Sequence, residues 1–193
     1  MPRGKPNLCL QVLVALLAFL SLGGAGSAQS GLSRSEAMKA VAVVTIPNWK
    51  ELSSAEGKFR ILFPGEPKLS DEIISMKGWN LSIGDTRWSV NFSDFDYRDP
   101  DDDRLRELYK STLATTIRKG ERLLFERNFR LNGRLGSEAA IRSLVKVRYM
   151  RALVLKRRLY VIAVQRKIDA RASKAIPAVV QQFFDSFAYW DVD

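Results

Sequence analysis

Six consecutive apolar residues, at positions 159–164, place the strongest constraint on how this chain can fold. A β-strand alternates its side chains between two faces, so a run that is apolar throughout needs cover on both faces. We therefore expect a central strand in a sheet that carries other elements on each side. A second strand-like segment at 147–155 and the basic tripeptide Lys156-Arg157-Arg158 precede it. Together they predict a hairpin with the basic residues at its tip.

The remaining strands are predicted from alternating apolar residues that lie between turn residues. Phe59, Ile61 and Phe63 alternate before Pro64-Gly65. Asn132-Gly133 is typical of a hairpin turn, and it joins an alternating run at 123–131 to a partner strand at 139–145. Further strands are expected at 71–77 and 79–83, on either side of Gly78, and at 88–92.

Two segments have the apolar spacing of amphipathic helices. The first begins in the acidic run Asp101-Asp102-Asp103 and ends at Gly120, which suits the charge preferences of helix ends. The second is predicted at 173–185, with Pro177 in its first turn. The order strands, helix, strands, helix predicts an α+β fold in which helices flank a mostly antiparallel sheet.

The first 28 residues have the pattern of a secretory signal peptide. Arg3 and Lys5 precede an apolar run at 8–22, and Gly26-Ser27-Ala28 offers small residues for cleavage after Ala28. The run is shorter than the roughly 20 residues that span a bilayer, although a retained anchor stays the alternative. We expect a cleaved signal (1–28), a flexible leader (29–47) and one domain (48–193). The mature chain would then be periplasmic or extracellular and would not span the membrane.

Composition excludes several kinds of chemistry. The chain has no histidine, and its one cysteine, Cys9, lies in the predicted signal. Histidine-based triads and ordinary zinc sites are therefore absent from the predicted mature chain, and we find no phosphate-binding loop or dinucleotide fingerprint. We expect no cofactor, no catalytic residues and no enzymatic activity.

The net charge of +10 falls to +8 when Arg3 and Lys5 leave with the signal, and this excess favours anionic surfaces. Because an exported chain seldom meets nucleic acid, we do not expect a nucleic-acid partner.

Four segments resemble, in the expected order, motifs of exported bacterial PsbP-like domains. They are the opening strand and Phe-Pro-Gly turn (56–67), a glycine-containing hairpin (131–138), the penultimate strand (158–161) and the closing helix end (184–187). The resemblance covers about residues 49–190 and implies an antiparallel sheet with flanking helices. It also implies a binding role, since photosynthetic members dock on membrane-bound photosystem II. Without histidine, no histidine-based site of those members can be transferred.

Basic residues in the last third of the chain supply the candidate partner-binding site. Lys146 and Arg148 share one face of a predicted strand, and Lys156, Arg157 and Arg158 cap the hairpin. We expect these five cations to dock on an anionic protein or envelope surface. Edge-strand cations that add solubility are the simpler interpretation of the same residues.

The acidic stretch at 94–103 supplies a candidate calcium site. Asp94, Asp96 and Asp99 are its predicted ligands, because calcium prefers several carboxylate oxygens. The pattern of an EF-hand loop is absent. A solvated strand end followed by an acidic helix start explains the same residues.

Two other functions stay open. The carboxylate pairs Asp94 with Asp96, or Glu126 with Glu138, could hydrolyse a cell-envelope glycan. A small-ligand carrier would need an aromatic groove, although aromatic residues on alternating strands pack in cores more often. The candidate groove residues are Trp49, Trp79, Trp88, Trp190, Phe95 and Tyr97.

Overall fold

The computed structural model describes residues 49–70, 76–94, 100–168 and 175–190. The predicted signal and leader lie outside these residues. In chain order the elements are β1 (Lys50–Ser54), β2 (Phe59–Phe63), β3 (Lys68–Ser70), β4 (Lys77–Ile83), β5 (Thr86–Asp94), α2 (Asp102–Thr116), β6 (Arg122–Leu131), β7 (Arg134–Arg142), β8 (Lys146–Leu155), β9 (Arg158–Lys167), α3 (Ala178–Asp185) and β10 (Ala188–Tyr189).

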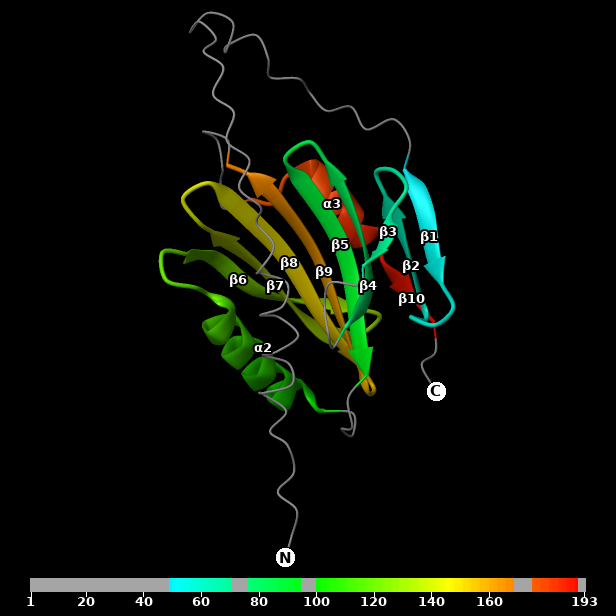
Figure 1. Cartoon of the computed structure of the whole chain (residues 1–193). Coiled ribbons are helices and arrows are strands. Elements are labelled where there is room, and N and C mark those ends of the chain that lie inside the picture. The colour runs from blue at the N-terminus through cyan, green and yellow to red at the C-terminus, as the bar shows by residue number, and fades with distance from the viewer. Residues whose placement is uncertain (1–48, 71–75, 95–99, 169–174, 191–193) are drawn as a thin grey trace, which may run out of the picture.

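The described residues form ten strands in two antiparallel sheets (Figure 1). The larger has seven strands in the order β3-β4-β5-β9-β8-β7-β6, and the smaller has the order β1-β2-β10. The strand that the sequence predicts as central, β9, is the fourth of the seven and pairs with β5 and β8. The predicted α+β fold is confirmed.

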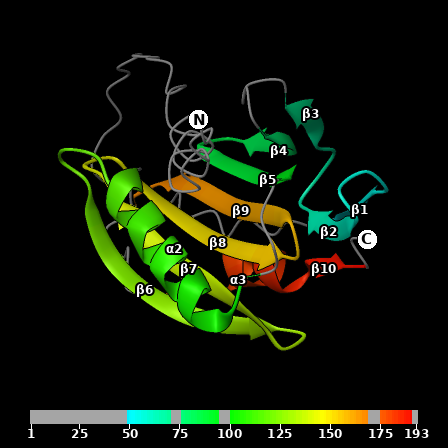
Figure 2. The same ribbon diagram turned by 90° about the horizontal axis from the view of Figure 1, so that it is seen from below.

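The large sheet is covered on both faces (Figure 2). On one face α2 packs over β7, β8 and β9 through Leu105, Leu108 and Leu113. On the other face lie α3 and the small sheet, with Phe59, Phe183 and other aromatic residues in the core. Alternate residues of β9 enter the two cores, which explains why its whole sequence is apolar.

The start of α2 agrees with the sequence prediction, but its end does not. The Asp101 side chain accepts a hydrogen bond from the Arg104 amide at 2.8 Å and caps the helix. The helix ends at Thr116, not at Gly120, because Ile117 has extended backbone angles. Gly120, with φ of +88°, instead shapes the turn that leads into β6.

The hydroxyl of Tyr109 fixes α2 against the sheet. It accepts a hydrogen bond from the Val154 amide at 2.9 Å and donates one to the Leu135 carbonyl at 3.3 Å. These backbone groups lie just beyond the last paired residues of β7 and β8, Gly136 and Leu153. The tyrosine therefore bridges the two strands where their ladder ends, and burial raises the pKa of its hydroxyl.

The second helix is shorter than predicted. It covers Ala178–Asp185, and Pro177 is its N-cap rather than a first-turn residue. Its C-cap, Ser186, accepts a hydrogen bond from the Leu62 amide at 3.0 Å and so joins the helix to β2.

The structure corrects the predicted break at Gly78 and adds three short strands, β1, β3 and β10, that the sequence does not predict. Gly78 lies inside β4. A glycine is needed at this position because the Asn91 side chain occupies the space that a β-carbon would need. The outer partner of β4 is β3, and residues 71–75 of the predicted 71–77 strand lie outside the described part of the chain. In β6, a bulge between Leu123 and Phe125 turns Leu123 away from the face that Phe125 and Phe129 share.

Candidate docking surface

The five predicted partner-binding cations do not form one surface. Lys146 begins β8, whereas Lys156 and Arg157 follow its end, so about 30 Å of strand separates them. In Figure 1 the β7–β8 turn lies at the upper end of the large sheet and the β8–β9 turn at the lower end. A partner that contacts one group therefore does not automatically reach the other.

Arg158 is committed to internal contacts. Its guanidinium donates hydrogen bonds to both carboxylate oxygens of Asp94, with Nε–Oδ1 and Nη2–Oδ2 distances of 2.5 and 2.6 Å. It also donates a hydrogen bond to the Glu56 carbonyl at 2.7 Å. It also lies 4.9 Å above the Phe92 ring and is only 8% exposed. The hydrogen bonds with Asp94 raise the pKa of Arg158. This residue holds the fold together and offers little surface to a partner.

The same contacts bear on the calcium prediction. Asp94 already binds a cation, Arg158, while Asp96 and Asp99 lie outside the described residues. Within the described ranges no group of three or more metal-ligating side chains comes together. Calcium binding at Asp94 would have to displace the arginine.

Arg148 is also buried. It shares a face of β8 with Lys146, as predicted, but that face lies under the end of α2. Its Nη2 lies 3.5 Å from Oε2 of Glu121, and burial lowers the pKa of the guanidinium. Arg148 therefore cannot reach a docked surface.

The upper end of the sheet gathers cations from four elements. Strand register places Arg122 opposite Arg142 and Lys146 opposite Lys167. The turn after α2 reaches the same end, since its Glu121 contacts Arg148. We call this region the basic end, and its cations are Arg118, Lys119, Arg122, Arg142, Lys146, Arg166 and Lys167. Two carboxylates of the described chain also lie at this end: Glu121, beside Arg148, and Asp85, on the β4–β5 turn.

The tip of the basic end is apolar. Leu144 and Val145 form the centre of the β7–β8 turn and are 92% and 61% exposed. The Ser143 amide donates to the Lys146 carbonyl at 2.8 Å, and the Lys146 amide donates to Ser143 Oγ at 3.0 Å. The Val145 carbonyl accepts a hydrogen bond from the Ile168 amide at 3.0 Å. These bonds hold the two apolar side chains outward.

The opposite end, which we call the paired end, has cations and carboxylates in contact. Arg158 binds Asp94, Arg130 binds Asp102, and Lys77 binds Glu56. Lys156 and Arg157 are exposed here, but they project from a region of mixed charge. The α2 helix adds to the contrast, because its acidic start lies at the paired end and its basic continuation lies at the basic end.

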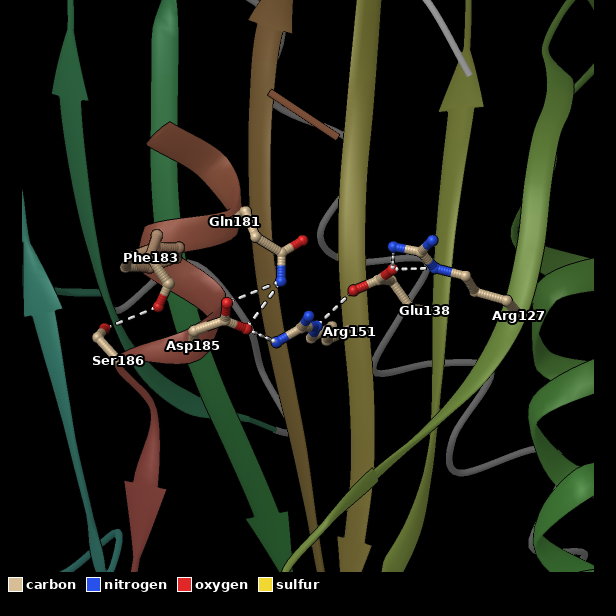
Figure 3. A network of polar contacts seen from close by, with 7 residues as sticks. All are labelled: Arg127, Glu138, Arg151, Gln181, Phe183, Asp185 and Ser186. Atoms are coloured by element: carbon tan, nitrogen blue, oxygen red, sulfur yellow. Dashed lines mark hydrogen bonds and ion pairs between the residues drawn. The ribbon is translucent and has the colours of Figure 1, made fainter. Parts of the chain in front are cut away.

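A charged network crosses the sheet face that carries α3 (Figure 3). Glu138 is fully buried, and its two oxygens accept hydrogen bonds from Arg127 and Arg151 at 2.6 and 2.5 Å. Arg151 also donates to Asp185 at 2.9 Å, and Gln181 binds the same carboxylate. The network ties β6, β7 and β8 to α3.

This arrangement separates the second proposed carboxylate pair. Arg127 lies opposite Glu138 and Glu126 lies opposite Ala139, so Glu126 and Glu138 project from opposite faces of the sheet. Two carboxylates on opposite faces of a sheet cannot share a proton or act on one substrate, so this pair cannot hydrolyse a glycan together.

The aromatic residues lie mostly in the core. Trp88 is buried and packs edge-on against Trp49 and Phe183, with centroids 5.9 and 5.2 Å apart. Trp79 stacks on Phe92 within the same core. Trp190 is partly exposed, while Phe95 and Tyr97 lie outside the described residues. The described part of the chain therefore provides core packing from these residues rather than an aromatic groove.

A small cavity lies between α2 and the sheet. Its volume is about 20 Å³, room for roughly one water molecule, and Tyr109, Ser137 and Met150 are among its lining residues. It is too small for the carried ligand that an aromatic groove was expected to hold.

Sequence reasoning missed Leu144 and Val145 as surface residues. The sequence predicts both residues at the end of a strand at 139–145, where apolar residues normally indicate burial. One feature of the sequence could have indicated their exposure. They lie between Ser143, a residue typical of turns, and Lys146, at the point where one strand ends and an antiparallel strand begins.

Comparison with known proteins identifies the fold. The chain resembles the solution structure of cyanobacterial PsbP (CyanoP) from Synechocystis sp. PCC 6803, with a TM-score of 0.53 and 14% identity over 77% of this chain and 96% of that one. It also resembles the Saccharomyces cerevisiae Ran-binding protein Mog1p, with a TM-score of 0.46 and 11% identity over 74% and 95% of the two chains. The fold is PsbP-like.

The other two comparisons gave no match: neither a protein-family model nor a curated protein matches this sequence.

The described residues contain no helix with the length and apolar character needed to cross a bilayer.

Proposed function

We propose that this chain is an exported, non-catalytic accessory module that binds an anionic partner through its basic end. The observation that carries the proposal is the gathering of cations from four neighbouring strands at one end of the large sheet, where Arg142, Lys146 and Lys167 lie beside an exposed turn. Such a surface attracts an anionic partner over long range and orients it. The PsbP-like fold and the predicted signal peptide are consistent with docking at an envelope surface.

This proposal keeps Lys146 from the sequence prediction and changes the rest of the site. Arg148 and Arg158 are buried in internal ion pairs, so we assign them to stability. Lys156 and Arg157 are exposed at the paired end and serve as the comparison group. Arg142 and Lys167 join Lys146 in the proposed site.

The test compares charge reversal at the two ends. The protein is isolated in the form that its native cells accumulate. It is then bound to the envelope fraction of those cells at low salt and released by added salt. We expect Arg142→Glu with Lys146→Glu to abolish retention, and Lys156→Glu with Arg157→Glu to leave most of it. Equal retention of both double variants would refute the proposed site.

No observation in the described residues favours the glycan hydrolase or the small-ligand carrier. The Asp94 carboxylate is occupied by Arg158, and Glu126 and Glu138 lie on opposite faces. Of the aromatic residues expected in a groove, Trp49, Trp79 and Trp88 pack in the core instead.

A further inference from the structure

The exposed apolar side chains of this protein are not scattered. Six large apolar residues of the described chain are exposed, and four of them lie at the basic end: Ile83, Leu123, Leu144 and Val145. Leu123 is the second residue of β6, Ile83 ends β4, and the other two form the β7–β8 turn. Isolated exposed apolar residues such as Ile83 and Leu123, each 39% exposed, are ordinary on protein surfaces. The adjacent pair Leu144 and Val145 differs, because two strongly exposed apolar side chains project together from one turn.

The fold does not require apolar residues in this turn. Turn positions favour glycine, proline, asparagine, aspartate and serine, because those residues suit the backbone or bond to it. Here Ser143 supplies the bonds, and neither Leu144 nor Val145 is buried. By contrast, the β6–β7 turn carries Asn132-Gly133, with φ of 50° and 81°, as turn geometry demands.

Cations flank this apolar tip on both sides. Arg142 and Lys146 lie next to the turn in sequence, Arg122 lies across from Arg142, and Lys167 lies across from Lys146. Four neighbouring strands spaced by about 4.8 Å spread these charges over a width of roughly 14 Å. A membrane-surface site has this composition, with apolar side chains for the acyl boundary and cations for anionic headgroups.

We infer that the basic end binds an anionic lipid bilayer, with Leu144 and Val145 entering the interface and the flanking cations contacting the headgroups. The inference rests on the proposed function and names its partner. A bilayer fits better than a protein because the apolar area is a narrow projecting tip. A stable protein interface buries about 800 Å² on each partner and is packed as closely as a protein interior.

Vesicle flotation tests the inference with the protein in the form that its native cells accumulate. We expect binding to vesicles that contain phosphatidylglycerol, little binding to phosphatidylcholine alone, and release at high salt. Leu144→Ser with Val145→Ser should weaken binding about tenfold or more, because the two apolar side chains that enter the bilayer interface are lost. Each of Arg142→Gln and Lys146→Gln should weaken it about fivefold.

Matched controls separate the tip from general stickiness. Leu69 is as exposed as Val145, at 61%, but lies on β3, so Leu69→Ser should leave vesicle binding unchanged. Lys156→Gln, at the paired end, should also have little effect. The tip variant should keep the thermal midpoint of the parent because its side chains are exposed.

A second measurement reads insertion directly. An environment-sensitive dye on Leu144→Cys, in a Cys9→Ser background, should shift to the blue on anionic vesicles, and the same dye on Leu69→Cys should not. Absence of vesicle binding, or tip variants that bind like the parent, would overturn the lipid inference. If envelope retention still depends on Arg142 and Lys146 in that case, the partner is a protein and the proposed function stands. If envelope retention does not depend on these two residues, the lipid inference and the proposed function both fail.

Discussion

The two ends of the large sheet contain similar side chains in opposite arrangements. At the paired end, Arg158 and Arg130 contact Asp94 and Asp102, and the guanidinium of Arg158 is buried. At the basic end, Arg142, Lys146 and Lys167 surround a turn whose two central residues are apolar and exposed. Whether a cation is held in an internal ion pair or stays exposed therefore depends on what the strand register places beside it, and the number of cations in the sequence does not distinguish the two cases.

The largest effect is expected from breaking the ion pair of the paired end. Asp94→Ala should lower the free energy of unfolding by about 2–3 kcal/mol, because the Arg158 guanidinium would stay buried without a counter-charge. Urea denaturation measures the change. Glu66→Ala is the matched control, since Glu66 pairs with Lys50 in the open, and its cost should stay below about 0.5 kcal/mol. Equal costs would mean that Arg158 does not stabilise this end.

A smaller effect is expected from removing the hydroxyl that bridges β7 and β8. Tyr109→Phe should lower the free energy of unfolding by about 1–2 kcal/mol, because the buried Val154 amide loses its acceptor. Tyr189→Phe, on the half-buried edge strand β10, should cost less than about 0.5 kcal/mol. The same denaturation experiment compares the two variants, and equal values would contradict the bridging role.

The pH dependence of stability tests Tyr109 in a second way, through the ionisation of its hydroxyl. The folded state raises the pKa of Tyr109, so this hydroxyl contributes stability that is complete below pH 10 and is lost as the pH rises further. The loss should approach about 1.4 kcal/mol per pH unit, since the unfolded tyrosine ionises near pH 10. Denaturation between neutral and strongly alkaline pH should therefore show a shallower slope for Tyr109→Phe. Tyr160, whose pKa is also raised, should keep its own contribution in that variant.

The smallest energetic effect is expected from replacing single cations. This effect tests most directly whether the basic end and the paired end differ. Lys146→Gln should weaken association with an anionic partner by about 1 kcal/mol, a factor of about five, and leave unfolding unchanged. Lys156→Gln should change neither quantity appreciably. Titration of association against salt measures both, and the Lys146 variant should have the shallower salt dependence. Identical salt dependence would mean that the two ends are equivalent.

The local sequence determined most of the secondary structure. The uniformly apolar 159–164 run predicted a strand covered on both faces, and β9 is the central strand. The capping aspartate predicted where α2 begins, and Asn132-Gly133 predicted its hairpin turn. These predictions succeeded because backbone preference and side-chain periodicity act over a few residues.

Tertiary structure decided which side chains are available to a partner. A shift of one residue in register moves a side chain to the other face of a sheet, so spacing alone could not show that Glu126 and Glu138 diverge. Nor could it show that the end of α2 buries Arg148, that Asp94 reaches Arg158, or that the β7–β8 turn leaves Leu144 exposed. The sequence alone determined most of the strands, the existence of the two helices and a basic composition. Pairing between distant segments decided that exposed cations and apolar residues meet at one end of the sheet.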